Sequence, residues 1–131
     1  MGLGLQANFT KVDSKAEVSS LGYFAVPGIS DTANLVAFYE HGPLEARLAY
    51  NWRSKFLTDP GVPGTTLPST TDDYYQIDGR VGVRFGLGIL ASLEGVNLTN
   101  EKVRSYRQYK NQFAGYFDYG RQFWLKLSKN F

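Results

Sequence analysis

The feature that most constrains this chain is an alternation of apolar and polar residues with a period of two. It is clearest at residues 45–53, where Ala46, Leu48, Tyr50 and Trp52 alternate with Glu45, Arg47, Asn51 and Arg53. Successive side chains of an extended strand point to opposite faces, so this pattern predicts a strand with one apolar and one polar face. Related patterns predict strands at about residues 2–12, 32–40, 74–85, 89–98 and 116–131. No segment needs a helix of ordinary length, and the sequence therefore predicts an all-β fold.

The connections between these strands alternate between long and short. Long segments rich in glycine, proline and polar residues lie at 13–30, 54–73 and 99–115, and short turns lie at 41–44 and 86–88. Transmembrane barrels have the same order, with short periplasmic turns and long extracellular loops. If the C-terminus is periplasmic, all three long loops lie outside. The pattern predicts about six antiparallel up-and-down strands that form a single segment of a transmembrane β-barrel.

The polar faces carry charges that such a barrel turns toward its lumen. These residues are Arg47, Asp78, Arg80, Arg84 and Glu94. Centring the second short turn sets Arg80 directly across from Glu94, which predicts a cross-strand ion pair. The first short turn sets Glu40 across from Glu45. We expect either Arg47 on the diagonal or a β-bulge to relieve that repulsion.

Composition argues against several classes of function. The 131 residues contain no cysteine, which removes disulfides and thiolate chemistry. The formal charge is +2, with acids and bases interspersed, so nucleic acid is not an expected partner. His41 is the only histidine, so these residues assemble neither a histidine metal cluster nor a Ser-His-Asp triad. We expect no enzymatic activity, no metal site and no cofactor.

A membrane interpretation of this sequence depends on its strands. No apolar run approaches the roughly 20 residues of a transmembrane helix. The first five residues lack the basic and then long apolar pattern of a signal peptide. Two alternatives remain open. In a soluble β-sandwich or lipocalin-like binding module, the apolar face would line a core. Alternatively, a short chain could oligomerise into a complete pore.

Several stretches resemble one protein family and occur in matching order. They are PGIS at 27–30, NLVAFYE at 34–40, ARLAYNWRSKF at 46–56, LEGVNLTNE at 93–101 and YGR at 119–121. Together they look like the late barrel strands of TonB-dependent receptors, and the resemblance spans essentially the whole chain from Gly2. The end of the chain is similar to the terminal signal that marks outer-membrane barrels for assembly, here Phe123, Leu125, Leu127 and Phe131.

The resemblance implies a C-terminal barrel segment of a receptor in the bacterial outer membrane. Such receptors import nutrients, carbohydrates and siderophores among them, and the inner-membrane TonB complex opens the path by pulling on a plug domain. The plug is not among these residues, so we expect TonB to act only through a plug elsewhere in the parent receptor. The family's barrel has about 22 strands. The other implied partners are therefore the rest of the barrel, outer-membrane lipid and the barrel assembly machinery.

One residue departs from the family pattern. Lys129 falls on the predicted lipid face, where the terminal signal usually has an apolar or aromatic residue. Near the periplasmic interface its ammonium group can reach water, so we expect the cost to be modest.

The loops after the third and fifth strands concentrate aromatic and basic residues. The candidates for ligand contact are Trp52, Arg53, Tyr74, Tyr75, Arg104, Tyr106, Arg107, Tyr109 and Phe113. Aromatic rings can stack on a sugar, and arginine can hold an anion. The alternative is that these residues form the interfacial aromatic girdle and pack the loops together. The lumenal charged residues could contact a plug domain or form ion pairs with one another. We expect them to form ion pairs with one another.

Overall fold

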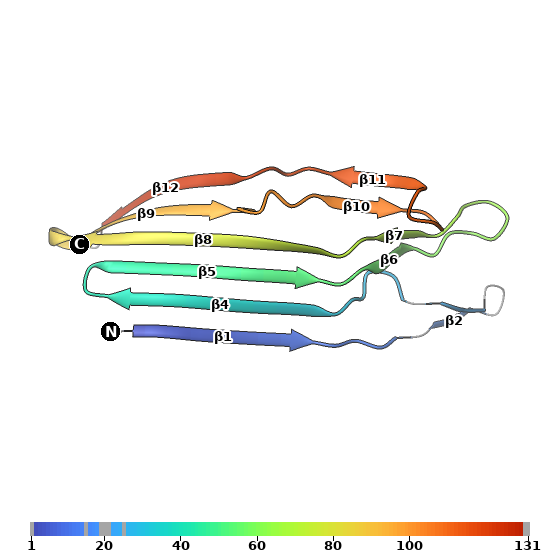
Figure 1. Ribbon diagram of the computed structural model, residues 1–131, viewed down its shortest axis with the longest axis horizontal. Helices are drawn as coiled ribbons and strands as arrows, with labels where there is room; N and C mark the ends of the chain where they lie inside the picture. Colours follow the sequence, from blue (N-terminus) through green and yellow to red (C-terminus); the bar gives the residue numbers. More distant parts are fainter. Residues whose placement is uncertain (1, 15, 19–21, 25, 130–131) are drawn as a thin grey trace.

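Six long antiparallel strands form one sheet in chain order (Figure 1). The computed structural model describes residues 2–14, 16–18, 22–24 and 26–129, with the backbone alone for 16–18 and 22–24. The strands are β1 Gly2–Thr10, β4 Thr32–His41, β5 Leu44–Arg53, β8 Tyr74–Phe85, β9 Ile89–Val96 and β12 Gln122–Lys129. The predicted all-β fold with antiparallel, up-and-down strands is confirmed. Strands β1 and β12 form the two edges of the sheet, and they do not pair with each other.

Glycine allows the two short turns of the sheet. The turn between β4 and β5 consists of Gly42 and Pro43, with Gly42 at φ +56°. The turn between β8 and β9 is a single 3₁₀ turn, Gly86–Gly88, in which Leu87 and Gly88 both have positive φ. Glycine adopts this left-handed backbone at little cost, whereas most residues do not.

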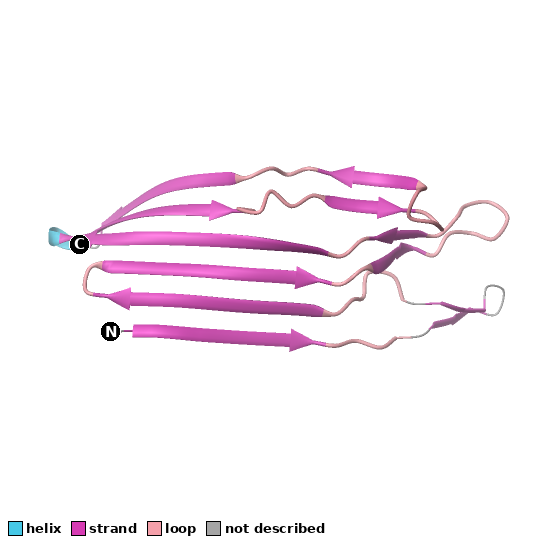
Figure 2. Cartoon of the chain, viewed as in Figure 1, coloured by secondary structure: helices cyan, strands magenta, loops and turns pink. Residues whose placement is uncertain are grey.

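The long connections contain hairpins that the sequence did not predict. The connection between β1 and β4 contains β2 Ala16–Val18 and β3 Gly22–Phe24. The next contains β6 Phe56–Asp59 and β7 Ser69–Thr71, and the last contains β10 Val103–Tyr106 and β11 Phe113–Phe117. Strands β7 and β10 pair with each other, which joins two of these connections into a four-stranded sheet in the order β11-β10-β7-β6 (Figure 2).

The predicted final strand, residues 116–131, begins too early. Residues 116 and 117 belong to β11, where Tyr116 pairs with Arg104 and Phe117 pairs with Val103. Gly120 then takes φ +67°, and β12 starts at Gln122. The alternation in this region is real, but the left-handed glycine divides it between two strands that lie in different sheets.

The six-stranded sheet is a single layer without a core. Its main contacts are between neighbouring strands. Among the described residues, no hydrophobic side chain is buried, whereas Leu5 is 72% exposed and Leu125 is 76% exposed. A soluble domain of this size normally buries most of its aliphatic side chains. In the described part of the chain, no helix is long and apolar enough to cross a membrane.

The register of the sheet keeps the apolar side chains of neighbouring strands on the same side of the sheet. Its five strand pairs show no register shift. One row of directly paired residues crosses all six strands: Leu5, Ala37, Leu48, Gly79, Gly95 and Phe123. The rows on this side are apolar or aromatic, except for His41 and Lys129 at the end with the short turns. We call this side the apolar face and the other side the polar face.

Candidate functional site

The apolar face has aromatic residues near both ends. At the end with the long connections, Trp52 pairs with Tyr75, and the rings of Tyr50 and Tyr75 lie 5.8 Å apart. At the other end, the rings of Tyr39 and His41 lie 6.3 Å apart. Rings that are apolar in body and polar at the tip suit the boundary between hydrocarbon and headgroups. Strand parity turns Trp52 and Tyr75 away from the polar face, and the girdle alternative for them stays a prediction.

On the polar face, one glutamate holds two arginines of the neighbouring strand. One oxygen of the Glu45 carboxylate forms an ion pair with Arg80 at 3.0 Å, and the other accepts a hydrogen bond from Arg84 at 3.1 Å. Glu45 lies directly across from Gly82, which is between the two arginines, and a Cβ on Gly82 would come within 2.8 Å of the Glu45 Cγ. The glycine therefore leaves room for the glutamate to lie flat over β8 and reach both partners.

Both register predictions for this face are confirmed, and one expected contact is wrong. Arg80 lies opposite Glu94, with its Nε 3.4 Å from the Glu94 carboxylate. This is an electrostatic contact rather than a hydrogen bond, because the Arg80 Nε has no hydrogen-bond partner. Glu40 lies opposite Glu45 without a bulge. Arginines from β8 neutralise Glu45, and Arg47 makes none of the ion pairs found among the described residues.

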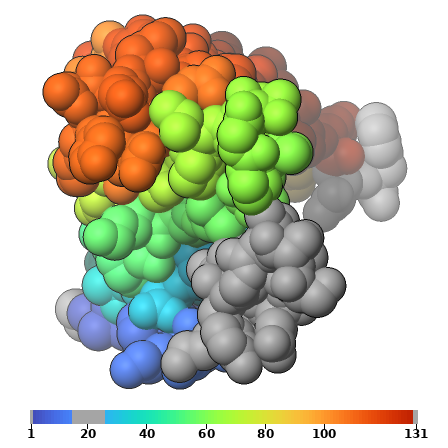
Figure 3. All heavy atoms as spheres, turned by 90° about the vertical axis from the view of Figure 1, so that its right-hand side faces the viewer, coloured from blue at the N-terminus to red at the C-terminus, as the bar shows by residue number. Residues whose placement is uncertain are grey.

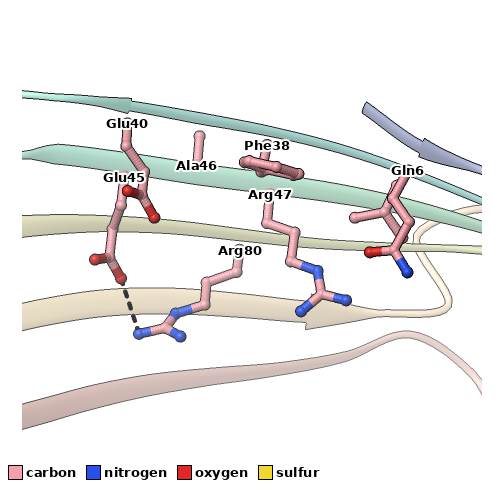
Figure 4. Close-up of a pocket in the computed structure, with 8 residues that line it drawn as sticks. Gln6, Phe38, Glu40, Glu45, Ala46, Arg47 and Arg80 are labelled. Atoms are coloured by element: carbon pink, nitrogen blue, oxygen red, sulfur yellow. Dashed lines mark ion pairs between the residues drawn. The ribbon is translucent and has the colours of Figure 1, made fainter. Parts of the chain in front are cut away.

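A hollow of about 410 Å³ lies beside this network on the polar face (Figure 4). Its charged and polar lining comes from Gln6, Glu40, Glu45, Arg47 and Arg80 on four strands. Phe38 also lines the hollow, and its ring covers Gly4, where a Cβ would come within 2.1 Å of the ring. Glu40 and Arg47 are exposed and make no ion pair within the described residues, so both remain available to a neighbouring surface.

The predicted lumenal carboxylate of Asp78 is used within the sheet. One oxygen accepts the Asn97 backbone N–H at 2.9 Å and the Gln76 side-chain amide at 2.7 Å. The other accepts the Asn51 amide at 3.4 Å. Asp78 on β8 is thus joined to β5 and to the connection after β9, and its acceptor capacity is largely occupied.

Asn97 is a connecting residue to which sequence analysis assigned no role. It is 5% exposed and has φ +56°, a backbone region that asparagine tolerates better than most residues. Its side-chain nitrogen donates to the carbonyls of Glu101 and Gly120, and its side-chain oxygen accepts the Glu101 N–H at 2.8 Å. The side chain therefore ties the end of β9 to the start of β12. The only sequence feature that pointed to Asn97 was its place in the LEGVNLTNE stretch.

Arg53 supports the backbone of the long connections. Its Nε donates to the Ser30 hydroxyl at 2.6 Å, and a second nitrogen donates to the Gly28 carbonyl at 2.5 Å. The guanidinium also lies 3.8 Å from the centre of the Phe56 ring. Tyr74 pairs with Arg53 on the polar face. Of these four strand-end candidates for ligand contact, two face the apolar side and one is engaged in packing.

The other ligand candidates lie at the loop end, where the β10–β11 hairpin packs beside the β6–β7 segment (Figure 3). Arg104, Tyr106 and Phe113 line a hollow of about 440 Å³, which Asp72, Lys110 and Tyr116 also line. Arg107 and Tyr109 lie in the turn of the hairpin, outside the lining of this hollow. The structure therefore brings three of the predicted residues together with five that were not predicted, Ser105 and Asn111 being the other two.

Beside this hollow, Lys102 and Asp118 form an exposed ion pair of 3.1 Å. Hydrogen bonds to Tyr116 and then to Asp118 raise the pKa of Lys102 above 10.5. The hydrogen bond from Lys102 lowers the pKa of Asp118 below 3.8. Both groups stay charged at neutral pH. An exposed pair of this kind contributes little stability.

The expected assembly residues of β12 lie as strand parity predicts. Phe123, Leu125 and Leu127 are on the apolar face, opposite Gly95, Leu93 and Ala91. Phe131 lies outside the described residues. Comparison with protein-family models, with curated proteins and with solved structures finds no match to this chain.

Proposed function

We propose that these residues form six adjacent strands of a β-barrel in a bacterial outer membrane, in a receptor that imports a nutrient with energy from the TonB complex. The observation that carries the membrane part is the apolar face, which is continuous across all six strands and on which no second layer packs among the described residues. The import role rests on the resemblance of the sequence to the C-terminal strands of TonB-dependent receptors.

The exposed apolar face supports contact with lipid. Side chains such as Leu3 and Leu48 are 70% and 51% exposed, and burial of each large aliphatic side chain is favourable by about 1.5–3 kcal/mol. Leaving a whole face of them in water would cost more than the net stability of a typical domain. Hydrocarbon around the sheet removes this cost without requiring a second protein layer.

The height of the apolar face also fits a membrane. Along β8 it runs from Tyr75 to Phe85. Ten residue steps correspond to about 33 Å at about 3.3 Å per residue. Strands tilted by about 40° then rise by about 25 Å, which is the height of the apolar band on outer-membrane barrels.

The two open edges support membership of a larger barrel. An unpaired strand edge leaves backbone N–H and C=O groups that hydrocarbon cannot satisfy, and even the smallest bacterial barrels have about eight strands. Both β1 and β12 therefore need further strands beside them in a membrane. In the proposed receptor these come from the rest of the barrel, and the short turns lie on the periplasmic side.

A cysteine scan along β5 in outer-membrane vesicles tests the membrane proposal. The sequence contains no cysteine, so each substituted residue is the one site for a nitroxide label among these 131 residues. We expect labels at Ala46, Leu48 and Tyr50 to be accessible to oxygen, which dissolves in lipid. Labels at Arg47, Ala49 and Asn51 should be accessible to a water-soluble nickel chelate.

The same scan separates the alternatives. A soluble sandwich or barrel predicts that labels at Ala46, Leu48 and Tyr50 are shielded from both reagents, and this result would overturn the proposal. For the import role, ligand uptake that continues unchanged without TonB would contradict energy-coupled transport. If the chain assembled a pore from its own copies, crosslinks between β1 and β12 of different copies would form in the absence of any other barrel segment.

A further inference from the structure

The hollow at the loop end combines aromatic rings with one cation, Arg104, that forms no ion pair within the described part of the chain. Lys110 lines the hollow and pairs with Asp72 at 3.3 Å, while its ammonium lies 5.9 Å from the centre of the Tyr106 ring. The Arg104 guanidinium lies 5.8 Å from the centre of the Tyr116 ring. It makes no ion pair among the described residues. Lys110 and Asp72 cancel, so Arg104 leaves the lining with one net positive charge.

The strands hold these side chains together. Arg104 pairs with Tyr116, and Tyr106 pairs with Phe113, so the cation and the three rings belong to one hairpin. The hairpin is attached to β7 through Ser105 and Tyr106. Thr71, which is 4% exposed, holds this junction with hydroxyl contacts of 2.7 Å to Thr58 and 3.0 Å to Ser105. The wall of the hollow is therefore built on paired strands.

The size and the chemistry of the hollow indicate a small ligand. Its volume of about 440 Å³ falls in the range of small-molecule sites, about 300–1,000 Å³. Exposed rings such as that of Phe113, which is 73% exposed, offer flat surfaces for stacking. A guanidinium offers paired N–H donors that match a carboxylate. A neutral sugar would not use the charge, and a bare anion would not use the rings.

We propose that this hollow binds a small cyclic carboxylate, with the carboxylate on Arg104 and the ring against Tyr106, Phe113 and Tyr116. Aromatic acids and uronic acids share this chemistry. The inference that this ligand is the imported molecule rests on the proposed function. Binding of the ligand to the hollow is tested independently of import.

A fluorescence titration tests the site. Asn111→Cys places the sole cysteine of the sequence on an exposed residue that lines the hollow, and an environment-sensitive dye is attached there in the detergent-solubilised receptor. The probes are benzoate, glucuronate, glucose and inorganic phosphate. We expect a saturable response to benzoate or glucuronate. The stronger of these two then distinguishes an aromatic acid from an acidic sugar.

Two substitutions on the same hairpin provide the control. Arg104→Gln should weaken binding of the acid at least about tenfold, as is usual for loss of a charged hydrogen bond. Arg107→Gln removes the same charge outside the hollow and should change binding less than about twofold. Both arginines are exposed, so neither change threatens folding.

Several results would overturn this inference. They are no saturable response to either acid, equal binding of glucose and glucuronate, binding of phosphate as tight as that of the acids, or equal effects of the two arginine substitutions. The β5 scan gives an independent result. If the titration showed no binding while the nitroxide labels along β5 still alternated in accessibility, the membrane proposal would stand and only the binding site would be rejected.

Discussion

The six-stranded sheet and the loop end are both built from antiparallel strands, but different forces specify them. The sheet has no register shift in any of its five strand pairs, and the alternation of apolar and polar residues specifies it. In the four-stranded sheet of the loop end, the register shifts within both hairpins. Hydroxyl contacts of Thr71 hold that sheet, and side-chain hydrogen bonds of Arg53 and Asn97 hold the connections next to it. A repeated pattern tolerates single changes that keep its chemistry, whereas a set of specific bonds does not.

The largest effect should come from a charge on the apolar face. Leu48→Arg places a guanidinium near the middle of β5, where the lipid-facing cost is about 2–4 kcal/mol of unfolding free energy. Ala49→Arg is the matched control, because Ala49 is on the polar face opposite Asp78. We expect it to cost less than about 1 kcal/mol. Urea unfolding of the barrel in phospholipid vesicles measures both, and equal losses would contradict the separation of the two faces.

An intermediate effect should come from the asparagine that connects β9 to β12. Asn97→Gly keeps the left-handed backbone and removes the side-chain bonds to Glu101 and Gly120. We expect a loss of about 1–3 kcal/mol, since buried backbone groups lose their partners. Asn100 also has positive φ, and none of its side-chain atoms appears in the hydrogen bonds of the described residues. Asn100→Gly should therefore change stability by less than about 0.5 kcal/mol.

Hydrogen exchange locates the Asn97 effect. The amide of Glu101, which donates to the Asn97 side chain, should exchange faster in Asn97→Gly. The amides of β5 should exchange as before. If the change loosened β5 as well, the loop end and the sheet would be one cooperative unit rather than two differently specified regions.

The smallest effect should come from the glutamate that lies over Gly82. Gly82→Ala pushes against Glu45 and should weaken its pairs with Arg80 and Arg84. Gly86→Ala is the control, since a Cβ there meets nothing within 4 Å. We expect Gly82→Ala to be less stable than Gly86→Ala by less than about 1 kcal/mol, because these ion pairs are partly exposed. A difference that persisted in a Glu45→Ala background, which removes the Cγ and the carboxylate, would show that the glutamate is not its cause.

Parity and turn length were enough to predict the faces of the main sheet and the register of its two hairpins with short turns. A period of two assigns each residue to a face, and a tight turn sets the register of the strands it joins. Arg80 opposite Glu94 and Glu40 opposite Glu45 were both predictable for this reason. Parity also contained the signal that Trp52 and Tyr75 face the apolar side, although both were proposed as ligand contacts.

Only the tertiary structure decided the loop end and the pairing of the charges. The pairing of β7 with β10 joins segments that are separated by more than thirty residues and have no alternating pattern in common. No local sequence pattern therefore predicts this pairing. Glu45 selects arginines on β8 because Gly82 leaves space there, a fact that depends on two strands being side by side. The backbone repeat therefore determined the faces and the register. The spaces between strands determined which side chains meet.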